Sequence, residues 1–271
     1  MNSKELYRRL NDTLSNISEE DYPEIYNIIE NELDFSDEAV YEEAYNIAGE
    51  LHEADGTKIL PECVADFIID VYTDELNSGN VNAACDIGSL YYTGRAGEQN
   101  YKKAVEYYTI AADGGCRQAQ ENLGYCFYYG RDMTVDYKKA FHYFALGAFD
   151  GHLRSLYKIG DMYRNGYYVN KNEKEAFCIY MHCAQGLNED NIHLVGADIM
   201  MRLGDCFFKG IGTEVDNKQA LKYYQLAEQM YYERLESGDF LIKNCYKHVL
   251  KNQEEARQRL NDVLSGYEWT K

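Results

Sequence analysis

A unit of 36 to 44 residues repeats through most of this chain and constrains its fold more than any other feature. Each copy carries a Leu-Gly or Ile-Gly pair, a second glycine six residues later, and an aromatic residue between the two glycines. The first glycines of the four copies are Gly88, Gly124, Gly160 and Gly204. Fixed periods of about 20–50 residues are typical of arrays in which each unit packs on its neighbours. The sequence therefore predicts a solenoid.

The second half of each unit has the pattern of a helix start followed by one apolar helix face. The expected N-cap residues, whose side chains accept hydrogen bonds from free backbone N–H groups, are Asn100, Asp136, Asn172 and Asp216. Four residues later an alanine begins a face with aromatic or apolar residues at +3 and +4 and small residues at +7. The second glycines suit the left-handed end of a preceding helix. Each unit is therefore predicted to be two antiparallel helices joined by a loop of about six residues.

These two halves together resemble the Sel-one-like repeat, a relative of the tetratricopeptide repeat. The residues that carry the resemblance in the first copy are Ala83, Ile87, Gly88, Tyr91, Gly94, Ala104, Tyr108, Ala111, Ala112 and Gly115. The resemblance implies an all-α fold, an α/α superhelix that is a right-handed solenoid of antiparallel helix pairs. It also implies a non-catalytic scaffold or adaptor for protein–protein interaction rather than an enzyme.

The repeats divide the chain into four parts. A helical cap is expected over 1–38, with helices over about 4–15 and 23–33, and a degenerate repeat over 39–80. Four repeats follow over 81–236, at 81–116, 117–152, 153–188 and 197–236, and capping helices over 237–271. The eight extra residues near 187–195 should lengthen a turn or the next helix. Because no Gly/Ser/Pro-rich linker interrupts the chain, one continuous solenoid is favoured over two domains.

The charge of the chain limits its partners. Its 27 Lys and Arg residues against 46 Asp and Glu residues give a net charge of −19, which repels phosphate backbones and anionic lipids. We therefore expect a neutral or basic peptide or protein partner, and neither nucleic acid nor membrane. Without an apolar stretch of about 20 residues or a secretion signal, a cytoplasmic location is expected. The eight cysteines should then be free thiols that fill the core.

Motifs that would carry chemistry are few. The six histidines include no pair at i, i+4, and there is no Cys-x-x-Cys, so we expect neither metal nor cofactor. Ser155 and Lys158 form a Ser-x-x-Lys motif, which leaves a hydrolase of the penicillin-recognising type as the alternative function. However, Ser155 occupies the small-residue packing position of Ala83 and Ala119, and neither Ser-Asp-Asn nor Lys-Thr-Gly follows.

A binding surface is the remaining candidate site. In the related tetratricopeptide fold the first helix of each pair lines the concave groove, so the resemblance points to positions −3, +1 and +4 from the first glycine. The expected partner-binding residues there are Ser89, Tyr92, Glu121, Tyr125, Tyr128, Tyr157, Asp161, Arg164, Asp205 and Phe208, while Cys85 and Met201 occupy equivalent positions. Tyrosine offers a large contact area with a polar tip. The alternative is that these tyrosines only pack between repeats in a chain that has 27 of them.

Overall fold

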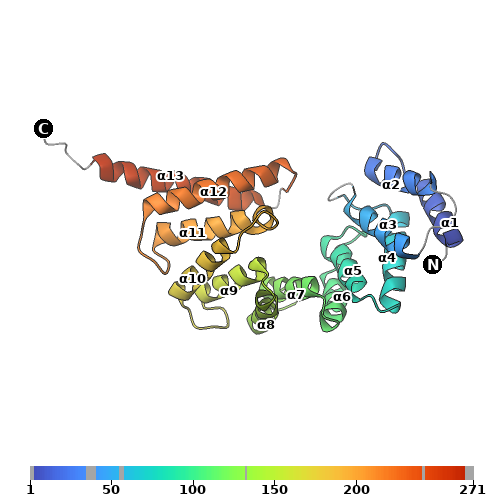
Figure 1. The fold of residues 1–271 in the computed structure, drawn as a ribbon, viewed down its shortest axis with the longest axis horizontal. Coiled ribbons are helices and arrows are strands. Elements are labelled where there is room, and N and C mark those ends of the chain that lie inside the picture. The colour runs from blue at the N-terminus through green and yellow to red at the C-terminus, as the bar shows by residue number, and fades with distance from the viewer. Residues whose placement is uncertain (1–2, 35–40, 55–57, 132, 240–241, 266–271) are drawn as a thin grey trace. The chain divides into compact units, whose positions relative to one another are not determined.

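The computed structural model describes residues 3–34, 41–54, 58–131, 133–239 and 242–265 (Figure 1). Over these residues the chain forms thirteen α-helices and one short π-helical turn, and no β-strand. The predicted all-α fold of paired helices is therefore confirmed. The chain divides into two compact units, residues 1–136 and 137–271, which are described separately as unit 1 and unit 2. The division into caps and repeats within one continuous solenoid stays a prediction.

Seven helices form over the described residues of unit 1. They are α1 (Ser3–Leu14), α2 (Pro23–Asp34), α3 (Tyr41–Glu53), α4 (Glu62–Asn77), α5 (Val81–Thr93), α6 (Tyr101–Asp113) and α7 (Arg117–Tyr129). The first two lie where the sequence places the N-terminal helices. A buried aliphatic and aromatic core runs from α1 through α5, with Ile29, Leu51, Phe67 and Ile87 almost fully enclosed.

Unit 2 contains six α-helices and the π-helical turn. They are α8 (Tyr137–Phe149), α9 (Leu153–Asn165), α10 (Glu173–Gln185), η1 (Ile192–Gly196), α11 (Ala197–Lys209), α12 (Asn217–Glu236) and α13 (Lys243–Ser265). The extra residues between the third and fourth copies form a turn, stabilised by the Asn188 and Asn191 side chains, and then η1. Helix α13 packs along α12 and also touches α11 (Figure 1).

The helix ends follow the predicted signals. The side chains of Asn100, Asn172 and Asp216 each accept a hydrogen bond from a backbone N–H in the first turn of the following helix. Asp136 directly precedes α8. The four second glycines all adopt the left-handed conformation, with φ between 64° and 76°. All four repeats therefore end their first helix in the same way, and the first, third and fourth begin their second helix with the same kind of side-chain cap.

The first glycine of a repeat allows the two helices of a pair to approach closely. The aromatic residues that face it in the first, third and fourth repeats, Tyr108, Tyr180 and Tyr224, are almost completely buried. A Cβ atom on Gly88 would lie only 2.6 Å from the ring of Tyr108, and Gly204 meets Tyr224 in the same way. A helix interior normally disfavours glycine, so the requirement for space explains why this residue recurs.

Candidate partner-binding surface

Five of the ten predicted binding residues lie on α5 and α7 of unit 1, and the other five on α9 and α11 of unit 2. In each unit, we call the side of these helices that carries them the first-helix face. Five of them are buried, with 3–8% of their surface exposed: Glu121, Tyr157, Asp161, Asp205 and Phe208. The other five are partly exposed: Ser89, Tyr92, Tyr125, Tyr128 and Arg164. The five buried residues thus pack between helices, whereas the five partly exposed residues are accessible to another molecule.

Asp161 is the centre of a buried polar network in unit 2. Arg202 on α11 binds its carboxylate through two hydrogen bonds, from Nε to Oδ1 and from Nη2 to Oδ2, each 2.7 Å long. The hydroxyl of Tyr180 also donates to Oδ1, at 2.8 Å, and Lys158 lies 3.6 Å away. The guanidinium carbon of Arg202 lies 4.3 Å from the ring centre of Tyr157. A residue predicted for the groove therefore joins one repeat to the next.

Asp205, the equivalent residue of the fourth repeat, has a similar set of partners. Tyr224 donates its hydroxyl to Oδ1 at 2.8 Å, and Nε2 of His248 lies 2.8 Å from the same oxygen. Arg164 approaches Oδ2 at 3.4 Å from the preceding repeat, and Lys209 at 3.7 Å. Because His248 belongs to α13, this carboxylate fastens the C-terminal helix to the last repeat.

Burial alone would raise the pKa of both carboxyls, since a charge is poorly solvated inside a protein. For Asp161 the charge and hydrogen bonds of Arg202 outweigh this penalty and lower the pKa below its usual value. For Asp205 His248, Tyr224 and Lys209 do the same. Both groups are therefore anionic when the protein is folded at neutral pH, and each is compensated by cations of this chain.

The lowered pKa of Asp205 predicts a specific pH dependence of stability. The unfolded side chain titrates near pH 4 and the folded one below it, so its contribution is present above about pH 5 and disappears as the pH falls through the folded pKa. The Asp205→Asn variant should be less stable than the parent by roughly 2 kcal/mol at pH 7, and this difference should shrink below pH 4. Urea unfolding at pH 7, 4 and 3 measures it. The exposed Asp190→Asn change serves as control and should show a small difference at every pH; a constant difference for Asp205→Asn would contradict the assignment.

Unit 1 uses different residues at the corresponding places. The hydroxyl of Tyr45 on α3 donates to Oδ2 of Asp86 on α5 at 2.6 Å. His52 is buried, with its ring nitrogens 3.2 Å from the Tyr72 hydroxyl and 3.0 Å from that of Ser89. Burial lowers the pKa of His52, which favours the neutral ring. The groups that hydrogen-bond to one another here are thus a carboxylate, hydroxyls and a neutral imidazole, and the buried guanidinium of Arg95 lies close enough to act on His52.

Several tyrosines lie near the C-terminal ends of α5 and α7 in unit 1. The ring of Tyr92 meets that of Tyr101 edge-on at 5.1 Å, and Tyr128 meets Tyr129 in the same way at 4.9 Å. The guanidinium carbon of Arg131 lies 5.3 Å from the ring centre of Tyr101 and 5.5 Å from that of Tyr129. These aromatic surfaces therefore already accommodate one cation of the chain itself.

The Ser-x-x-Lys motif does not form an accessible nucleophile. Ser155 is fully buried, and its hydroxyl is a buried group for which no hydrogen-bond partner is found. The side chain packs against Gly147 on α8, where a Cβ atom would touch it. Lys158 is also buried and pairs with Asp161. Ser155 therefore fills the small-residue packing position, as its alignment with Ala83 and Ala119 indicates.

The cysteines are all free thiols. Five are buried and two partly buried, as expected for core residues, but Cys178 on α10 is exposed. Within the described part of the chain, no group of three or more His, Cys, Asp or Glu side chains is placed to hold a metal ion. None of the helices described is long and apolar enough to cross a membrane.

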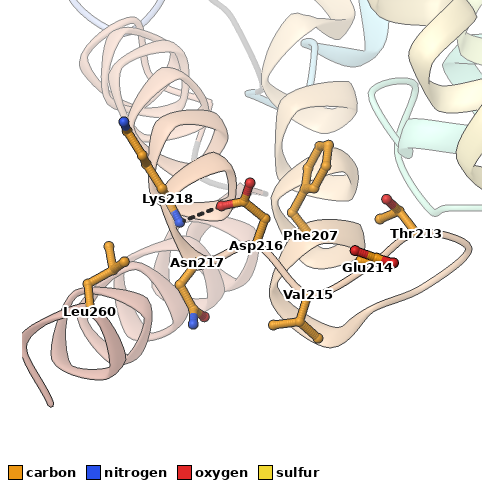
Figure 2. Close-up of a pocket in the computed structure, with 8 residues that line it drawn as sticks. All are labelled: Phe207, Thr213, Glu214, Val215, Asp216, Asn217, Lys218 and Leu260. Carbon is orange, nitrogen blue, oxygen red and sulfur yellow. Dashed lines mark hydrogen bonds between the residues drawn. The ribbon is translucent and has the colours of Figure 1, made fainter. Parts of the chain in front are cut away.

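A hollow of about 510 Å³ lies in unit 2 between the α11–α12 loop and α13 (Figure 2). Its apolar walls are Phe207, Val215 and Leu260, and Asp216 uses its carboxylate there to cap α12. None of the ten predicted binding residues lines it. Sequence reasoning missed it because it depends on where α13 lies against the last repeat.

The helix pairs, their shared caps and their glycine–aromatic contacts define a protein built from α-helical hairpin repeats. The family model of the Sel1 repeat matches residues 81–116, 117–152, 153–177 and 197–232. The chain therefore belongs to the Sel1 repeat family. No curated protein matches the chain.

Two solved structures support the fold. A Sel1 repeat protein from Oxalobacter formigenes is 23% identical over 70% of this chain and 73% of that chain, with a TM-score of 0.55. The protective antigen c5321 of uropathogenic Escherichia coli strains, which displays an SLR fold, is 18% identical over 81% of this chain, with a TM-score of 0.57. This chain spans 46% of the length of c5321.

Proposed function

We propose that the protein is a non-catalytic scaffold that binds a peptide or protein partner through the first-helix face. Membership of the Sel1 repeat family supports this function. The observation that carries it is the set of partly exposed side chains on this face: Ser89, Tyr92, Tyr125, Tyr128 and Arg164. Tyrosine and arginine are among the residues that most often dominate binding energy at interfaces. Arg164 already pairs with Asp205, and Ser89 with His52, so ordering these two side chains costs less entropy on binding.

The partner is proposed to be neutral or basic, because the chain carries a net charge of −19. The same charge disfavours nucleic acid and anionic membranes, and we propose a cytoplasmic location and no cofactor. The burial of Ser155 supports a binding role over hydrolysis by this residue.

Truncation of two partly exposed side chains tests the binding face. The Tyr128→Ala, Arg164→Ala double variant should bind the native partner, once isolated from cell extract and identified by mass spectrometry, at least tenfold more weakly. Calorimetric titration measures the affinity. Tyr232→Ala on α12 is the matched control because this tyrosine is 51% exposed on a second helix, and its loss should change affinity less than twofold.

Arg164 also pairs with Asp205, so circular dichroism and the melting temperature must show that the double variant is folded. An affinity within a factor of about two of the parent protein in a folded double variant would place the partner on another surface.

A further inference from the structure

The net charge of the chain is divided very unevenly between the two units. Residues 1–136 contain 9 Lys and Arg against 28 Asp and Glu, a net charge of −19, while residues 137–271 contain 18 of each kind and are neutral. The electrostatic attraction that the whole chain exerts on a basic partner therefore comes from unit 1.

One carboxylate of unit 1 lies on the first-helix face without a cation of its own. Asp86 on α5 is partly buried and accepts a hydrogen bond from Tyr45. Over the described residues of the chain, no Lys, Arg or His forms an ion pair with it. Burial raises the pKa of Asp86 above its usual value, although the hydrogen bond from Tyr45 and the nearby His52 oppose this, and the negative charge of Glu53 adds to the rise. A cation delivered by a partner would offset the cost of the buried charge and the repulsion from Glu53.

The repeats themselves show how such a cation is held. The residue two positions before the first glycine is Asp86, Asn122, Lys158 and Arg202 in the four copies. Arg202 pairs with Asp161, 41 residues earlier, and Asp86 pairs with Tyr45, also 41 residues earlier. In unit 2 the carboxylate of Asp161 thus binds Arg202, whose guanidinium also lies over the ring of Tyr157. In unit 1 Asp86 takes the position of Arg202 and Tyr45 that of Asp161, so a hydroxyl–carboxylate hydrogen bond replaces the ion pair and the charge of Asp86 has no guanidinium beside it.

We propose that Tyr45, Asp86 and Ser89, with Glu53 at the edge, form a subsite of the first-helix face that binds a lysine or arginine side chain of a basic partner segment. The carboxylate of Asp86 accepts hydrogen bonds from the cation, and the Tyr45 ring supplies an aromatic surface beside it. The proposal rests on the function proposed above, and it adds the chemistry of the partner and the unit that recognises it.

A synthetic peptide tests the subsite without the native partner. Fluorescence anisotropy of fluorescein-labelled (Arg-Gly)5 should report binding to the full-length protein at low ionic strength, and labelled (Gln-Gly)5 should not bind. The Asp86→Asn variant should bind (Arg-Gly)5 at least tenfold more weakly, because the amide keeps the size of the side chain and an acceptor for Tyr45 but loses the charge. Asp66→Asn removes one exposed charge elsewhere in unit 1 and should weaken binding less than twofold.

Glu53→Gln provides a second variant at an exposed position, where folding is not at risk, and should weaken binding about two- to threefold. Equal effects of Asp86→Asn and Asp66→Asn, or no binding of (Arg-Gly)5, would overturn the subsite. The native partner separates the two proposals. If it loses affinity in the Tyr128→Ala, Arg164→Ala variant while Asp86→Asn has no effect on the peptide, the binding face stands and the subsite is wrong.

Discussion

Replacing Arg202 with alanine is expected to lower the free energy of unfolding by about 3 kcal/mol, the largest loss among single changes on the first-helix face. The change removes both hydrogen bonds to Asp161 and, among the residues that the structure describes, leaves Lys158 and Tyr180 as the partners of this buried carboxylate. Removing one member of a buried ion pair typically costs about 3–5 kcal/mol because the remaining charge is uncompensated. Urea denaturation followed by circular dichroism measures the loss.

Two further variants separate this effect from the general loss of a cation. Lys209→Ala removes a cation that is 43% exposed and 3.7 Å from Asp205, so it should cost less than about 1 kcal/mol. The Asp161→Asn, Arg202→Met double variant removes both charges and should recover most of the stability. An Arg202→Ala loss no larger than that of Lys209→Ala would show that the pair does not stabilise the fold.

The second large expected effect is a reversal of sign between two glycine-to-alanine changes in unit 1. Alanine is normally more favourable than glycine in a helix by about 1 kcal/mol. At Gly49 on α3 a Cβ atom would have nothing within 4 Å, so Gly49→Ala should raise the free energy of unfolding by about 0.5–1 kcal/mol. At Gly88 the Cβ atom would lie 2.6 Å from the Tyr108 ring and 3.3 Å from a backbone oxygen, so Gly88→Ala should lower it by about 1–3 kcal/mol.

Both variants lie in the same unit, so thermal and urea unfolding can compare them directly. If both changes stabilise the protein, the close approach of α5 and α6 does not require glycine, and the repeated Leu-Gly pair needs another explanation.

Most of the fold could be predicted from the sequence because its signals are local and are repeated four times. The spacing of glycines, caps and apolar residues gives the helix pairs without knowledge of long-range contacts, and the end of α9 at Gly166 is one example. The two units could not be predicted in this way. Their boundary lies between Asp136 and Tyr137, at a helix start that has the same pattern as the other three.

The candidate site was less predictable, for a physical reason. Counting from the first glycine places Asp161 on the first-helix face, but it does not reveal that Arg202, 41 residues away, covers it. That pairing depends on the offset between neighbouring helices. The same limit applies to Asp86, which lies outside the −3, +1 and +4 positions. An alignment of the repeats does contain a signal for it, because Asp86 is acidic where the other three copies have non-acidic residues.

A gain or loss of repeats during evolution would affect the glycine–tyrosine contacts and the Asp161–Arg202 ion pair in different ways. The glycine–tyrosine contacts join residues that are 20 positions apart within one repeat, such as Gly160 and Tyr180 or Gly204 and Tyr224. A duplication or deletion that inserts or removes a whole repeat carries both members together. The pair of Asp161 and Arg202 instead crosses the junction between two repeats, so the same event separates its members. An array of this kind can therefore change length without disturbing its hairpins, whereas each new junction must acquire its own matching charges.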